Sequence, residues 1–177
     1  MFTGSTSAMA WGAVFTLLLA AGCVTDLRER RIPNVLVVLL LVGGLLFAAS
    51  SGPIGSSLVR SLAGVAAGFG IWIVFYMIGA MGAGDVKFFA AAGAWLGPAT
   101  TWRAALIAAV TGGVLAVVFL LQERRLGITL RRLAMAASSR SLGVVGGGSE
   151  PGTGARRPLP YGVALAVGAF LAAWLPQ

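Results

Sequence analysis

The chain has 177 residues, of which 58% are hydrophobic and only 10% are charged, and its net charge is +8. Soluble domains are about 45–50% apolar, so this composition predicts an integral membrane protein with one transmembrane domain over residues 1–177. The absence of histidine and the single cysteine, Cys23, exclude an imidazole metal site, a histidine-based triad, an internal disulfide and a CxxC zinc site. The cations lie mostly between apolar runs, where membrane topology explains them better than nucleic-acid binding.

The first apolar run, at residues 9–25, is long enough for a membrane helix. Within it, LLAAGC at residues 18–23 resembles a lipoprotein cleavage box, which leaves a removable signal as an alternative. No Lys or Arg precedes the run and a basic cluster follows it, the reverse of a signal peptide. We therefore expect this run to stay as a helix.

The second and third runs follow a short charged turn. Pro33 suits the first turn of a helix that reaches about residue 49, and SSGP at residues 50–53 breaks it. The third run covers residues 58–79. Its Gly64 and Gly68 have the spacing of a small-residue packing face, which lets two helices approach closely in lipid.

A fourth helix is expected from Asp85 to about residue 96, where Gly97-Pro98 closes it. This helix is short for a span, so it is either tilted against its neighbours or begins in a water-filled dip. Both interpretations place Asp85 slightly below the membrane surface. A fifth run covers residues 102–121.

Residues 122–158 form a polar, arginine-rich segment, predicted to be a cytoplasmic loop. Its first half is typical of an amphipathic helix on anionic lipid, and its glycine-rich second half is typical of a flexible linker. A solvated or lipid-facing segment is the plain interpretation, and a specific partner site is the alternative. A last run covers residues 161–175.

Six runs with these loops predict an all-α bundle of about six transmembrane helices. Cytoplasmic loops carry an excess of Lys and Arg, which places the N-terminus outside, because only Arg60 and Arg103 then lie on the outer side. Asp26, at the end of the first run, and Asp85 both emerge at the cytoplasmic face.

The chain holds only five acidic residues: Asp26, Glu29, Asp85, Glu123 and Glu150. A carboxylate near membrane depth is costly and marks a functional site. Two carboxylates brought together share a proton and hold a water, from which one removes a proton while the other donates to a carbonyl oxygen. That chemistry hydrolyses peptides without a metal or cofactor. Gly82 and Gly84 would let the backbone turn sharply and a substrate strand approach.

Structural roles compete with the catalytic ones. Asp85 precedes a helix and is a candidate N-cap, and Asp26 is a candidate interfacial charge paired with Arg28 or Arg30. Several further positions have plain roles in anchoring or turn formation: Lys87 as an interface anchor, Pro33 and Asn34 at the entry to the second helix, and Tyr161 as an interfacial aromatic.

Three motifs in order resemble the type IV prepilin peptidases, a family of membrane aspartic proteases. GAGDVK at residues 82–87 is similar to the family's GxGDxK motif, and Asp26 followed by RIPN at residues 31–34 is similar to its first-aspartate motif. RPLPYG at residues 157–162 is similar to the string that enters the last helix. The glycine-rich motif alone is weakly specific, and the combination is strongly so.

The resemblance implies an enzyme of the bacterial inner membrane, without a cofactor, that cleaves prepilins or pseudopilins at the cytoplasmic face, after the glycine that ends a short basic leader. Asp26 and Asp85 would be catalytic. Seven residues would bind substrate or shape the site: Gly82, Gly84, Lys87, Pro33, Asn34, Glu29 and Tyr161. We further expect Glu29 and the ionised aspartate to favour the leader's cations.

The sequence departs from the larger members of that family, which carry an extra cytoplasmic segment with paired CxxC motifs and also methylate the new N-terminus. With one cysteine and a short first loop, the chain resembles the compact members that serve tight-adherence (Flp) pili, so methyltransferase activity is not predicted. A small ion- or proton-coupled carrier and a non-catalytic assembly subunit are the alternative functions.

Overall fold

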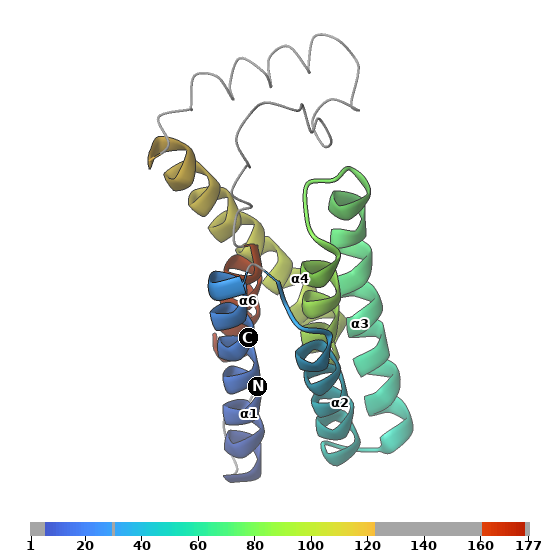
Figure 1. Ribbon diagram of the computed structural model, residues 1–177. Helices are drawn as coiled ribbons and strands as arrows, with labels where there is room; N and C mark the ends of the chain where they lie inside the picture. Colours follow the sequence, from blue (N-terminus) through green and yellow to red (C-terminus); the bar gives the residue numbers. More distant parts are fainter. Residues whose placement is uncertain (1–5, 30, 123–160, 176–177) are drawn as a thin grey trace.

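The computed structural model describes residues 6–29, 31–122 and 161–175, and all the secondary structure within them is helical (Figure 1). Its elements are α1 (Thr6–Glu29), α2 (Asn34–Ser50), α3 (Ile54–Met77), α4 (Ala83–Gln122) and α6 (Tyr161–Trp174). Three helical stretches are long and apolar enough to cross a membrane: Thr6–Glu29, Ile54–Met77 and Ala83–Val118. The protein is therefore a polytopic membrane protein, as the composition predicts. The predicted basic loop lies, beyond residue 122, outside the described residues.

The predicted fourth and fifth runs form a single element, α4, which is interrupted at Gly97. Gly97 has φ +70° and ψ 170°, a conformation that is essentially confined to glycine. The prediction that Gly97-Pro98 ends the first of these runs is confirmed. The predicted gap before the next run was wrong, because the helix resumes directly at Pro98, whose fixed φ and missing N–H suit the start of a helix.

Two other predicted boundaries also need correction. α1 continues to Glu29, so Asp26 lies within the helix and not beyond it. Pro33, expected in the first turn of the second helix, occupies its N-cap position with extended dihedrals (φ −63°, ψ 138°).

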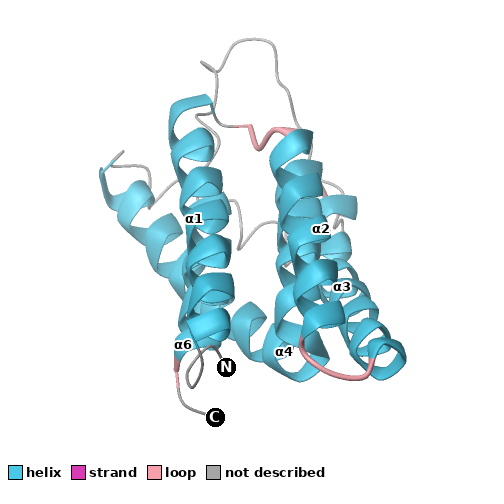
Figure 2. Ribbon diagram, turned by 90° about the horizontal axis from the view of Figure 1, so that it is seen from below, coloured by secondary structure: helices cyan, strands magenta, loops and turns pink. Residues whose placement is uncertain are grey.

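α4 holds the bundle together. It contacts α2, α3 and α6, while α1 packs on α6 and α2. Figure 2 shows the result from below, with α1 beside α6 and α2 beside α3. The first half of α4 packs on α2 and α3, where Gly44 meets Ala94 and Gly68 meets Ala90. The second half packs on α6, where Gly168 meets Ala104.

The predicted small-residue face of α3 is confirmed. Gly64 and Gly68 are buried, and a Cβ added at Gly64 would collide with the backbone carbonyl of Gly93 on α4. A Cβ at Gly68 would lie 3.1 Å from backbone atoms of Ala90 and Phe89. Backbone contact of this kind is the usual way for helices to associate in lipid, where no hydrophobic driving force acts between them.

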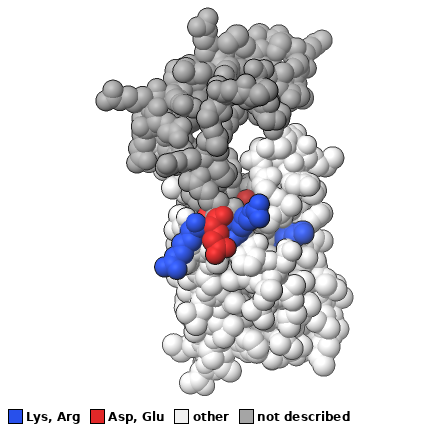
Figure 3. All heavy atoms as spheres, in the orientation of Figure 1, with Lys and Arg blue, Asp and Glu red and all other residues white. Residues whose placement is uncertain are grey.

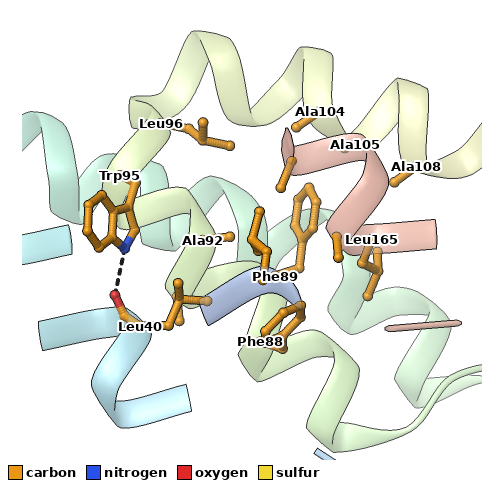
Figure 4. Close-up of a cluster of buried hydrophobic side chains, with 14 of the residues drawn as sticks. Leu40, Phe88, Phe89, Ala92, Trp95, Leu96, Ala104, Ala105, Ala108 and Leu165 are labelled. Carbon is orange, nitrogen blue, oxygen red and sulfur yellow. Dashed lines mark hydrogen bonds between the residues drawn. The ribbon is translucent and has the colours of Figure 1, made fainter. Parts of the chain in front are cut away.

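Aromatic residues fill the core around the first half of α4. Trp95 donates a hydrogen bond of 2.7 Å from its indole Nε1 to the carbonyl of Leu40 (Figure 4). The centroid of its ring lies 5.6 Å from the ring centroid of Phe47 and 5.2 Å from that of Phe15. Phe88 and other large apolar side chains complete the cluster. This packing fixes the orientation of α4, and with it the position of the α4 N-terminus.

Candidate active site

Asp26 is a buried carboxylate at the C-terminal end of α1, with 6% of its surface exposed. The buried residues of α1 recur at helical spacing: Gly12, Phe15, Leu19, Gly22 and Asp26. Such spacing places them on one face. Asp26 therefore continues the packing stripe of the helix and points into the bundle, not into the lipid.

The partner that the structure gives to Asp26 is the start of α6. The backbone N–H of Gly162 donates a hydrogen bond of 2.9 Å to Asp26 Oδ2. The first N–H groups of a helix have no acceptor within the helix, and this end carries the positive pole of the helix dipole. A Cβ at position 162 would lie 2.7 Å from Asp26 Oδ2. Only glycine lets the carboxylate approach this closely.

Asp85 lies in the first turn of α4 and is half-buried. It is the third residue of the helix, so it does not occupy the N-cap position that the sequence allowed for it. Its carboxyl group accepts a hydrogen bond from the backbone of Gly82. Gly82 is also close in space, since a Cβ there would lie 3.3 Å from Asp85 Oδ2.

The two aspartates interact across the bundle. The charge of Asp26 acts on the carboxyl group of Asp85, and the charge of Asp85 acts on the phenol of Tyr161. The C-terminal end of α1 and the N-terminal ends of α4 and α6 thus bring three functional groups from distant parts of the sequence to one place.

The remaining predicted site residues surround this pair less closely. Gly84 faces the turn between α1 and α2, because a Cβ there would lie 3.8 Å from Ile32. The other four are exposed: Glu29 at the end of α1, Pro33 and Asn34 at the start of α2, and Lys87 in α4. The structure therefore brings together Asp26, Asp85, Gly82 and Tyr161, and leaves these four on the surface.

Gly162 is a site residue that the sequence reasoning did not select. The string RPLPYG was recognised as a motif, but only Tyr161 was taken from it as a candidate. A glycine next to an aromatic residue at the start of a helix was the available signal. The sequence does not show that Gly162 and Asp26, which are 136 residues apart, are joined by a hydrogen bond.

On the face drawn in Figure 3, the charged side chains of the described residues form a single band across the molecule, and no charged side chain is seen below it. Among the described residues, no group of three or more His, Cys, Asp or Glu side chains is placed to hold a metal ion.

Comparison with known proteins gives matches that cover about half or more of the chain. The prepilin leader peptidase/N-methyltransferase of Escherichia coli (strain K12) is 38% identical over 110 residues, which are 58% of this chain and 48% of that protein. The protein of the same name from Aeromonas salmonicida (strain A449) is 33% identical over 118 residues, 62% of this chain and 39% of that protein. The chain thus spans less than half the length of these curated relatives.

No solved structure matches the chain significantly. The sequence profile of the Type IV leader peptidase family matches residues 13–117, a stretch that contains both Asp26 and Asp85. This match covers more than half of the sequence, and the chain belongs to the Type IV leader peptidase family.

Proposed function

We propose that this protein is an aspartic endopeptidase of the membrane that removes the leader from type IV prepilins or prepilin-like proteins, with Asp26 and Asp85 as its catalytic pair. The observation that carries the proposal is the convergence of these two carboxyl groups from the ends of α1 and α4. The family membership and the names of the relatives support the choice of substrate.

The proposed chemistry needs one ionised and one protonated carboxyl group. The ionised aspartate takes a proton from a water held between the pair, and the water oxygen attacks the scissile carbonyl carbon. The protonated aspartate donates its proton to the carbonyl oxygen. When the tetrahedral intermediate collapses, the nitrogen leaves with a proton from the first aspartate. No covalent intermediate with the enzyme is formed.

In this proposal the protein crosses the bacterial inner membrane six times, with its N-terminus outside. The two halves of α4 would be separate spans that reverse direction at Gly97, as their course in Figure 1 suggests. The charge rule for cytoplasmic loops supports an active site that faces the cytoplasm. Arg28, Arg31 and Lys87 are exposed at that end.

The proposed substrate is cut after the glycine that ends a short basic leader. Glu29 is exposed three residues beyond Asp26, and its charge would attract the leader's cations. Gly84, Pro33 and Asn34 would shape the approach to the pair, and Lys87 would anchor it at the interface. The short turn between α1 and α2 and the single cysteine support the compact form that serves tight-adherence pili. The proposal covers peptidase activity alone.

The test is the removal of each acid in turn. We expect Asp26→Asn and Asp85→Asn each to reduce prepilin cleavage by about 10³-fold or more, because the pair acts as a unit whose members cannot substitute for each other. Arg103→Gln, at an exposed position of α4, is the control. Cleavage is followed by the mobility shift of a prepilin incubated with purified enzyme in lipid.

Wild-type cleavage by either Asn variant would remove that residue from the mechanism. Ion uptake into vesicles that contain the protein, with no cleavage of any prepilin, would favour the carrier instead. Equal thermal unfolding midpoints for the variants and the wild type separate a lost reaction from a lost fold.

A further inference from the structure

A cavity of about 300 Å³ lies between α3, the second half of α4, and α6. On α3 its wall is formed by two aromatic residues, Trp72 and Phe75. Leu165 on α6 and Gly112 and Gly113 on α4 also line it. Phe75 and Gly113 are exposed, so the cavity reaches the surface of the protein. None of the residues that line it is charged.

The cavity lies next to the proposed active site. Tyr161 forms part of its wall, and the phenol of Tyr161 interacts with the charge of Asp85. The next residue, Gly162, holds Asp26. Met81, four residues before Asp85, also lines the cavity. A peptide bond placed at the two aspartates therefore has this cavity beside it.

The cavity extends from Tyr161 into the apolar part of the bundle. On α6 its wall runs from Tyr161 to Leu165, about 6 Å along the helix at 1.5 Å per residue. On α4 it runs from Ala108 to Ala116, about 12 Å. A basic leader finds no charge of opposite sign there, whereas an apolar segment finds a matching surface.

The volume of the cavity determines which part of an apolar substrate segment can enter it. A helix with its side chains is about 10–12 Å wide, so a stretch 12 Å long occupies on the order of 1,000 Å³. The cavity is too small for such a stretch. It has room for large side chains that project from a segment lying outside it.

We propose that this cavity is the subsite for the side chain that directly follows the scissile bond, that it accepts a large aromatic or aliphatic side chain, and that Gly112 and Gly113 set the size it accepts. The proposal rests on the proposed peptidase function. The missing side chains at these two positions leave the space open on the α4 side. A Cβ at Gly113 would meet no atom within 4 Å, and one at Gly112 only Ala164 Cβ at 3.5 Å.

The experiment uses one prepilin in three forms, with Ala, Leu or Phe directly after the glycine at the cleavage site. We expect the wild type to cleave the Leu and Phe forms with a kcat/KM about tenfold higher than the Ala form, the range that extra methylene groups give in an apolar pocket. Gly113→Leu fills the cavity and is expected to abolish this preference. Ala116→Leu, at another lining position, is expected to do the same.

The matched control is Gly70→Leu on α3. An added Cβ at Gly70 also meets no atom within 4 Å, but Gly70 does not line the cavity. This variant is expected to keep the wild-type preference. A preference unchanged in both filling variants, or an equal loss for all three substrates, would overturn the subsite while leaving the peptidase function in place. Failure of the wild type to cleave any of the three forms would instead contradict the proposed function itself.

Discussion

The contact between Gly162 and Asp26 shows how the absence of one side chain lets a backbone N–H reach a buried carboxylate. A buried carboxylate is stable only when hydrogen bonds replace the water it has lost, and a charged acceptor strengthens the bond that it receives. Here the donor is a backbone N–H at a helix start, which cannot rotate away. The bond therefore fixes where the Asp26 carboxylate lies relative to Asp85.

Gly162→Ala is expected to reduce the rate of prepilin cleavage ten- to a hundredfold, because its Cβ displaces Asp26 from the second aspartate and misplacement by about 1 Å has that effect. The measurement is kcat for a prepilin substrate in lipid. Gly70→Ala introduces the same methyl group where an added Cβ has open space and should retain the wild-type rate. A wild-type rate in Gly162→Ala would show that the close contact is unimportant.

The two buried tryptophans offer a comparison within one protein. The indole N–H of Trp95 is hydrogen-bonded to the carbonyl of Leu40, whereas that of Trp72 is buried and has no hydrogen-bond partner among the described residues. Replacement by Phe leaves a similar void at both positions but breaks a bond only at position 95. We expect Trp95→Phe to be less stable than Trp72→Phe by about 1 kcal/mol, as measured by chemical unfolding in detergent. Equal loss would mean that the bond contributes nothing.

At the scale of single residues, the sequence allowed the acidic residues to be identified as candidates, because acidic residues are rare in its composition. Five acids in an apolar chain direct attention to Asp26 and Asp85, because carboxylates at membrane depth are costly. Glycine is abundant in this chain, with 26 residues, so the position of Gly162 beside an aromatic residue at a helix start was too weak a signal to separate it from the others. Its importance appears only when α1 and α6 are seen in contact.

At the scale of the helix, α4 is the element that the sequence predicted least completely. The Gly97-Pro98 pair indicated a break, but the resumption of the helix at Pro98 was not foreseen. One further contact is visible only in the structure. The hydroxyl of Thr101 donates a hydrogen bond of 2.7 Å to the carbonyl of Gly97, so the break is stabilised by a side chain from the following turn.

Gly97→Ala is expected to destabilise the fold by about 1–3 kcal/mol, because an alanine in this backbone conformation is strained. An added Cβ would also lie 2.7 Å from Arg60 Nε, although that exposed side chain is able to move. The shift is measured as a lower thermal unfolding midpoint in detergent. Gly70→Ala lies within a regular helix and should be neutral or stabilising. An unchanged midpoint in Gly97→Ala would show that the bend tolerates a side chain.

At the scale of the whole molecule, hydrophobicity and its interruptions predicted most of the helices to within a few residues, because spans in lipid must satisfy their backbone internally. Hydrophobicity did not predict which helices pack against each other. Only the small-residue face of α3 was identified in advance. The contact of α1 with α6 depends on the complementary shapes of surfaces that are far apart in sequence.

The proposed topology predicts which turns face the cytoplasm. In a Cys23→Ser background, which removes the only natural cysteine, new cysteines are introduced by Arg31→Cys between α1 and α2 and by Gly52→Cys between α2 and α3. Both positions are exposed. A membrane-impermeant maleimide added to spheroplasts should label position 52 at once and position 31 only after permeabilisation. The opposite labelling pattern would place the N-terminus in the cytoplasm.

The first half of α4, residues 83–96, rises only about 21 Å at 1.5 Å per residue, against a hydrocarbon thickness of about 30 Å. Residues 88–96 of this segment are buried, so neighbouring helices of the bundle, and not lipid, cover it. A segment that is enclosed by protein does not have to match the thickness of the hydrocarbon layer. In the proposed topology the start of α4, with Asp85, would therefore lie below the membrane surface without any distortion of the surrounding bilayer.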